Sequence, residues 1–178
     1  MDWRELIVDG YDRLPELMQG VLSGLRQAEL DWQPHRDANS LGWTAWHLTR
    51  VLDSEIAALM GEAQLWIRDG WHKRFKRPAD PDDTGYGHTP EQVRAFRSPS
   101  ARVQLDYLRV AVVRSKAYLA AVSPSELDRE LDEPWFRPLP TVGVRIVSVL
   151  TDCHLHAGEA SYLRGLVKAR GRRSRASR

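Results

Sequence analysis

Apolar side chains recur every three or four residues in four long segments of the chain, the spacing of one face of an α-helix. These segments span residues 3–26, 42–60, 99–122 and 141–169. Pro15 lies inside the first segment, so we expect that helix either to be kinked at the proline or to start after it. The pattern predicts four long helices.

Residues suited to helix ends lie beside these segments. Asn39 or Ser40 can cap the start of the second helix, and Gly61 can close its end. Pro99 suits the first turn of the third helix, and Thr141 suits the cap of the last one. The end signals support the four predicted helices.

Four long helices without a convincing strand pattern predict an all-α fold, a four-helix bundle with long crossover connections. One connection includes a basic aromatic stretch, WHKRFKR (71–77), followed by the loop PADPDDTGYGHTP (78–90). The other is SPSELDRELDEPWFRPLP (123–140). We expect both to cross one end of the bundle and to form a pocket there, because long loops in compact domains often carry function.

The composition is that of a soluble globular protein, with 42% hydrophobic and 28% charged residues in a chain of 178. The N-terminus carries acids where a signal peptide requires a basic start, and no apolar run approaches the roughly 18 residues of a membrane span. We therefore expect one cytoplasmic domain, residues 1–169, without a membrane partner. Cys153 is the single cysteine, which excludes an internal disulfide and a cysteine-rich zinc site.

Residues 170–178, RGRRSRASR, contain five arginines, so the net charge of +2 divides into a basic tail and a body of net charge −3. We expect the arginine-rich tail to be disordered and solvated. Because the body is mildly acidic, it offers no evident face for nucleic acid, and binding of phosphates by the tail is the weaker interpretation.

Asp152 and His156 are four residues apart in the last predicted helix, so their side chains leave one face a turn apart. Val149 and Leu163 extend that face, which indicates that it points inward. A carboxylate and an imidazole on an apolar face are costly unless they are paired, and a divalent metal ion would pair them. His47, on the apolar face of the second predicted helix, is the candidate third ligand. Three protein ligands and an open position are typical of a catalytic metal site.

Other interpretations stay open at this point. His47 can be a satisfied core histidine, and Asp152 with His156 can be a buried hydrogen-bonded pair. His154 projects about 200° around the helix from His156, so we expect it to be exposed and not to join the same ion. Cys153 is best interpreted as a small buried thiol.

Two segments resemble a known family. ANSLGWTAWHLTRVLDSEI (38–56) and DCHLHAGEASYLRGL (152–166) are similar to the two signature segments of the DinB/YfiT-like superfamily. Members are four-helix bundles related to the mycothiol-dependent maleylpyruvate isomerases and the bacillithiol transferases. The resemblance implies that His47, Asp152 and His156 hold a divalent ion, with zinc favoured and nickel, iron or manganese as alternatives. Many relatives carry histidine at the place of Asp152, so this site is the more anionic one.

The resemblance also implies chemistry on thiols. A metal-bound thiolate of mycothiol or a similar small thiol would attack an electrophilic substrate, which makes the chain a thiol S-transferase or a related hydrolase. Maleylpyruvate isomerases carry a further C-terminal domain that supplies a catalytic arginine, and without it isomerisation is not expected here. The alternative is a non-catalytic, stress-associated metal-binding protein. Related bundles often form dimers, which leaves a homodimer open.

Trp43, Trp46 and Arg50 follow the helical spacing of His47 and are candidates for substrate binding. The alternatives are core packing for the two tryptophans and a surface ion pair for the arginine.

Three further residues are candidates for the site. Glu159 lies one turn beyond His156 and is a candidate general base or a group that orients that histidine. Tyr86 and His88 lie beside two glycines in the long loop, where the tyrosine could contact substrate and the histidine could transfer protons. Ordinary solvated positions are the alternative for all three.

Overall fold

The computed structural model describes the backbone of residues 2–176 and the side chains of residues 2–172. Within that range the fold is all-helical, as predicted, and its β pairing is limited to one isolated bridge between Glu130 and Thr141. The long helices are α1 (Trp3–Leu22), α3 (Leu41–Met60), α7 (Ala101–Ala121) and α9 (Val142–Ala176). The short helices are α2 (Gln27–Leu30), α4 (Leu65–Arg68), α5 (Trp71–Arg74), α6 (Pro90–Ala95) and α8 (Pro124–Leu127).

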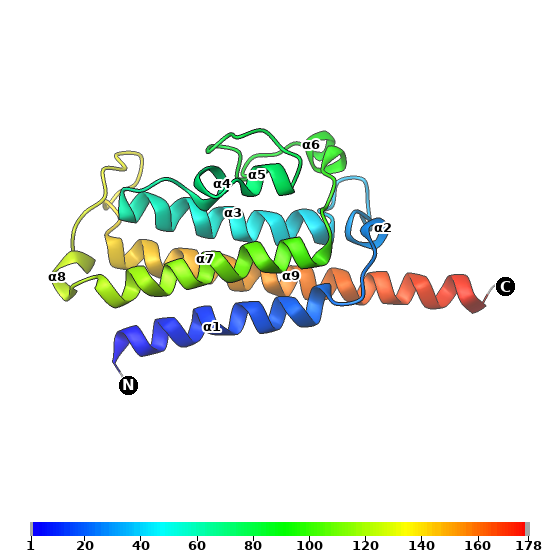
Figure 1. Cartoon of the computed structure of the whole chain (residues 1–178), viewed down its shortest axis with the longest axis horizontal. Coiled ribbons are helices and arrows are strands. Elements are labelled where there is room, and N and C mark those ends of the chain that lie inside the picture. The colour runs from blue at the N-terminus through cyan, green and yellow to red at the C-terminus, as the bar shows by residue number, and fades with distance from the viewer. Residues whose placement is uncertain (1, 177–178) are drawn as a thin grey trace.

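The four long helices form a bundle in which α1 and α9 run in one direction and α3 and α7 in the other (Figure 1). α3 packs against α9 and α7, and α1 packs against the same two helices. Because α3 and α7 are parallel, the chain must return along the length of the bundle between them. The connection over residues 61–100 does this along the outer side of α3 and carries α4, α5 and α6 (Figure 1).

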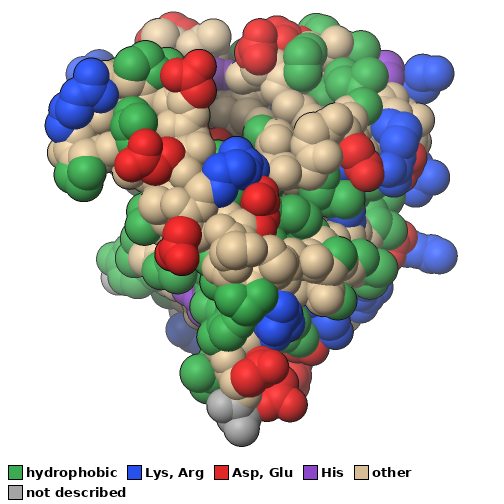
Figure 2. Space-filling model, turned by 90° about the vertical axis from the view of Figure 1, so that its left-hand side faces the viewer, with side chains coloured by type: hydrophobic (Ala, Val, Ile, Leu, Met, Phe, Trp, Pro, Cys, Tyr) green, Lys and Arg blue, Asp and Glu red, His purple; other side chains and the backbone are tan. Residues whose placement is uncertain are grey.

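The two long connections therefore lie in different places. The prediction that both cross one end of the bundle is wrong for residues 61–100, which follow the side of α3, and right for residues 122–141, which lie with α8 at one end (Figure 1). Figure 2 views that end and shows a hollow in the surface between two lobes. The difference arises because α3 and α7 are neighbours that run in the same direction. The chain that joins them must therefore travel back along the full length of the bundle.

Three of the predicted capping residues lie at helix ends in the structure, as expected. The Ser40 hydroxyl accepts a hydrogen bond from the backbone N–H three residues on, at 3.2 Å, and so caps α3. Gly61 closes α3 in the left-handed region at φ 64°. The Thr141 hydroxyl accepts from the backbone N–H at the start of α9 at 3.3 Å.

Other predicted boundaries need correction. Ser100 caps α7 through its side chain, so Pro99 lies before the helix and not in its first turn. α1 starts at Trp3 and continues through Pro15, which excludes a late start. α9 does not end near residue 169 but continues to Ala176, and it extends beyond the other long helices (Figure 1). Part of the segment expected to be a disordered tail is thus helical, and the remainder, 177–178, lies outside the described residues.

The first half of α3 is buried on all sides. All ten residues from 41 to 50 are buried, because the bundle covers one face of the helix and the crossover connection covers the other. The connection contributes its own large apolar side chains to the core: Leu65, Trp66, Trp71, Phe75 and Phe96.

A buried carboxylate anchors the crossover connection to α3. Asp53 is 1% exposed, and its oxygens accept hydrogen bonds from the backbone N–H groups of Leu65 and Trp66 at 2.9 and 2.8 Å. The Tyr107 hydroxyl donates to the same carboxylate at 2.7 Å, and Arg114 donates at 3.3 Å. These partners compensate the desolvated charge and hold α4 against α3.

Candidate metal centre

α3 and α9 bring three potential ligands to one point. One ligand atom each from His47, Asp152 and His156 can be chosen so that all lie within 4.8 Å of one another. The rings of His47 and His156 meet edge to face, with centroids 4.7 Å apart and an interplanar angle of 79°. Nε2 of His156 lies 3.5 Å from a carboxylate oxygen of Asp152, as the four-residue spacing predicts. The contact between α3 and α9 adds His47, which spacing alone could not place.

In each histidine, a neighbouring oxygen holds one ring nitrogen, and the other nitrogen can bind a metal ion. Nδ1 of His47 donates to the backbone carbonyl oxygen of Thr84 at 2.6 Å, since a carbonyl can only accept. Nδ1 of His156 contacts a carboxylate oxygen of Glu159 at 2.7 Å. Metal-binding histidines commonly have their second nitrogen held in this way, because it fixes the tautomer and the ring orientation.

The remaining carboxylate oxygen of Asp152 is the clearest sign that these residues fit a cation. Oδ2 is buried and has no hydrogen-bond partner among the described residues. Leaving a buried acceptor unpaired costs about 1–3 kcal/mol. Two imidazole nitrogens and one carboxylate oxygen form a donor set that suits zinc and neighbouring divalent metals.

The protonation of the two histidines differs for physical reasons. Burial lowers the pKa of His47, which keeps its imidazole neutral and able to bind a cation. The hydrogen bond to Asp152 raises the pKa of His156 to about 8. Protons and metal ions therefore compete for His156 near neutral pH.

The comparisons with known proteins agree with this architecture. The sequence model of the DinB superfamily matches residues 11–160, most of the chain. The chain belongs to the DinB superfamily. A crystal structure of a conserved protein from Enterococcus faecalis is 30% identical to it and superposes with a TM-score of 0.87, covering 95% of this chain and 99% of the other. No curated protein matches the chain significantly.

In this DinB-superfamily protein, the loop of residues 78–90 covers the His47 side of the site. Gly85 has a φ of 92°, and a Cβ added there would lie 2.9 Å from ring atoms of both Trp43 and Trp46 and 3.0 Å from Nδ1 of His47. Only a glycine can approach so closely in this conformation. The close approach places the Thr84 carbonyl on the histidine.

Trp43 packs against His47, and His88 in turn holds Trp43. The Trp43 ring stacks on His47 with centroids 4.8 Å apart and an angle of 15°. Nε1 of Trp43 donates to Nδ1 of His88 at 3.2 Å, and Nε2 of His88 then donates to Asp83 at 2.9 Å. Both nitrogens of His88 are engaged, so His88 holds the Trp43 ring in place, and its predicted proton transfer stays a prediction.

Arg50 does not occupy a substrate site. Its side chain is fully buried, and it donates to the backbone carbonyls of Asp83 at 3.1 Å and Pro81 at 2.9 Å. Its guanidinium also lies over the Trp66 ring at 4.7 Å. The predicted contact with substrate is therefore replaced by a structural role, in which Arg50 fixes the loop that holds His47.

The other predicted residues fall into three environments. Trp46 is fully buried in the core, in line with the packing alternative, and Trp43 is 5% exposed. Tyr86 is 91% exposed and can contact only what binds outside the loop. Glu159 contacts His156, which favours its orienting role over that of a general base.

Sequence reasoning missed the residues that position His47. The Thr84 carbonyl, the Asp83 carboxylate and the close approach of Gly85 all come from the loop. The two glycines in TGYG were the available signal, since closely spaced glycines in a loop indicate positive φ or close packing.

Proposed function

We propose that this protein is a divalent-metal-dependent enzyme of the DinB superfamily, an S-transferase that uses a low-molecular-weight thiol of the mycothiol type. The convergence of His47, Asp152 and His156, with a buried Asp152 oxygen left unpartnered, is the observation that carries the proposal. Zinc is the favoured ion, with nickel, iron or manganese as alternatives.

The residues of the chain have distinct roles in this proposal. His47, Asp152 and His156 would hold the ion, and the Thr84 carbonyl and Glu159 keep the two imidazoles oriented. When bound, a divalent ion lowers the pKa of a coordinating thiol or water and so supplies a nucleophile at neutral pH. With water in place of the thiol, the same residues would support a hydrolase.

The number of ligands favours an enzyme over the alternative of a non-catalytic, stress-associated metal-binding protein. A closed structural site would need a fourth protein ligand, and His88 and Glu159 are the two residues to consider for it. Both nitrogens of His88 are engaged, and Glu159 holds the outer nitrogen of His156. Among the described residues, the group that can share an ion has three members, which is typical of catalytic sites.

The partners in this proposal are a small thiol and an electrophilic substrate. None of the helices over residues 2–176 combines the length and apolar character needed to cross a bilayer. A cytoplasmic location, a homodimer and the absence of nucleic-acid binding stay predictions.

Metal analysis tests the site directly. The chain purified without a histidine tag should contain about one divalent ion per chain by elemental analysis, and His47→Ala should lose it. His154→Ala is the matched control, because His154 lies on the same helix as His156 and contacts the Leu150 carbonyl instead of the triad. Stoichiometric metal in His47→Ala would remove His47 from the site.

Activity is tested separately with mycothiol and monochlorobimane. We expect metal-dependent conjugation that is lost in His47→Ala and retained in His154→Ala. If metal binds at the triad but no low-molecular-weight thiol stimulates conjugation, the transferase proposal fails and the metal centre stands.

A further inference from the structure

We propose that a cavity on the crossover side of the bundle, away from the metal centre, binds a phosphate-bearing small molecule. The cavity has a volume of about 670 Å³ and is lined by the end of α5, the segment that joins α6 to α7, and Gln27 of α2. This volume falls within the usual range of small-molecule sites. The basic stretch 71–77, which the metal centre does not use, forms one wall of the cavity.

The charge of the lining points to an anionic ligand. Arg74, Lys76, Arg77 and Arg97 line the cavity, and no aspartate or glutamate does. Four cationic side chains around one concave surface create a positive potential that attracts anions. Arginine is the side chain best suited to phosphate, because its donors match the oxygen geometry.

Most of this charge is not compensated by the protein. Arg77 pairs with Asp83, but none of Arg74, Lys76 and Arg97 has a carboxylate partner within 4 Å among the described residues. One terminal nitrogen of Arg97 donates hydrogen bonds to two backbone carbonyls, which holds the guanidinium in place. None of its other donors has a carboxylate partner among the described residues.

The backbone after α5 places these cations together. Lys76 has a φ of 54°, the left-handed region that non-glycine residues adopt at a cost. The turn is closed by hydrogen bonds from the N–H of Lys76 to the Lys73 carbonyl at 3.0 Å and from the N–H of Arg77 to the His72 carbonyl at 2.9 Å. It reverses the chain so that residues 74, 76 and 77 all border the cavity.

The rest of the lining indicates a small ligand and not a nucleic acid strand. Gln27 and Ser100 add neutral hydrogen-bonding groups, and the partly exposed Val103 adds apolar surface for an organic group. Proteins that bind single-stranded nucleic acid commonly stack the bases on exposed aromatic rings. Phe75 is 3% exposed and therefore offers no such platform.

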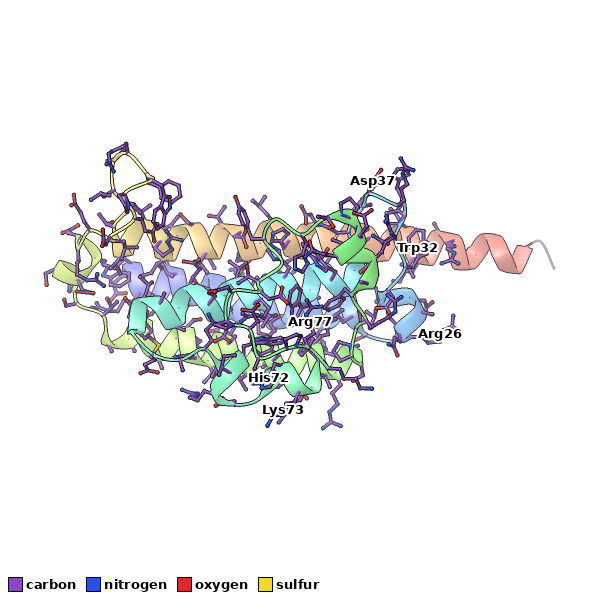
Figure 3. The ribbon with its side chains drawn as sticks, turned by 90° about the horizontal axis from the view of Figure 1, so that it is seen from above. Arg26, Trp32, Asp37, His72, Lys73 and Arg77 are labelled. Carbon is purple, nitrogen blue, oxygen red and sulfur yellow. The ribbon has the colours of Figure 1, made fainter. Side chains whose placement is uncertain are left out.

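The cavity is separate from the metal centre. None of His47, Asp152 and His156 lines it. Figure 3 shows Arg77 close to α3, and its guanidinium lies 4.8 Å from the centre of the Trp46 ring. The proposal therefore does not depend on the metal chemistry.

Calorimetric titration of the full chain with inorganic pyrophosphate and with phenyl phosphate tests the proposal. We expect binding of at least one of them, weakened about tenfold or more in Arg97→Gln and in Lys76→Gln, because each loses a charged contact with the anion. Lys73→Gln is the matched control for Lys76→Gln: Lys73 belongs to the same basic stretch but does not line the cavity, so its affinity should stay within about twofold.

Phosphates can also bind a metal ion, so the titration is repeated on His47→Ala. Unchanged binding in that variant supports the cavity, whereas binding that disappears belongs to the metal centre and overturns the proposal. Absence of binding of both small phosphates by the wild-type chain, or an equal loss in Lys73→Gln, also overturns it. A short single-stranded oligonucleotide that binds when neither small phosphate does would replace it with a nucleic-acid surface.

Discussion

α3 and α9 supply the candidate metal ligands under opposite conditions. The α3 ligand lies in a stretch that is buried on all sides, and a loop distant in sequence holds it through Thr84 and Gly85. The α9 ligands lie on a partly exposed helix, with the Asp152 side chain 37% and the His156 side chain 17% exposed, and they contact each other and Glu159.

The difference shows two ways of orienting a ligand. On α9, the spacing of residues along the helix is enough to orient a ligand, because side chains one turn apart contact one another. A ligand inside the core depends on tertiary contacts, and its position is as stable as the segments that make them. Substitutions should therefore affect the α3 side mainly through folding and the α9 side mainly through metal affinity.

The largest expected contrast is between two aspartates. Asp53→Asn should lower the free energy of unfolding by about 3–5 kcal/mol, because Arg50 and Arg114 lose a buried counter-charge. Asp152→Asn, measured without metal above pH 8, where His156 is neutral, should change it by less than about 1 kcal/mol. Urea unfolding with chelator measures both, and equal losses would remove the distinction between the two helices.

A pair of glycines tests the loop that holds His47. Gly85→Ala should destabilise the chain by about 1–3 kcal/mol and weaken metal binding, because the left-handed backbone is strained and the new Cβ meets the tryptophan rings. Gly87→Ala is the control: its φ is 71°, but nothing lies within 4 Å of an added Cβ. If the two variants behave alike in urea unfolding and zinc titration, the contact with His47 does not matter.

pH should act on the α9 side in opposite directions with and without metal. The folded pKa of His156, about 8, lies above its ordinary value of 6.5. The charged imidazole therefore stabilises the metal-free chain below pH 6.5, by about 1 kcal/mol after solvent screening, and this stability is lost as the pH rises through 8. Zinc affinity should instead rise over the same window, because protons leave His156. In Asp152→Asn, unfolding without metal should lose the larger part of this pH dependence, because only Glu159 still stabilises the charged imidazole of His156. A pH dependence equal to that of the wild-type chain would assign it to another group.

The smallest effect is expected from Glu159→Gln, which keeps the shape of the side chain but removes its charge from His156. We expect about tenfold weaker zinc binding with little change in stability, since Glu159 is exposed and acts on a ligand. Glu16→Gln, an exposed position on α1, is the control and should leave zinc affinity unchanged. Unaltered affinity in Glu159→Gln would mean that Asp152 alone orients His156.

Much of this molecule follows from local pattern in the sequence. Apolar spacing located the four long helices, Ser40, Gly61 and Thr141 marked three of their ends, and the four-residue spacing put Asp152 beside His156. These features depend on neighbours within one or two helical turns, so the sequence alone determined them. The apolar face of the second predicted helix made His47 the candidate third ligand, and the family resemblance supported it. Helix packing brings it to the same point as Asp152 and His156.

Tertiary structure decided the rest. Whether Arg50 lies at the surface or in the core, and which side chains His88 contacts, depends on where the crossover connection lies. That course follows from the parallel packing of α3 and α7, a contact between segments far apart in the chain. The cationic cavity also forms only when α2, α5 and the start of α7 meet, because local spacing carries no information on which distant side chains will share a space.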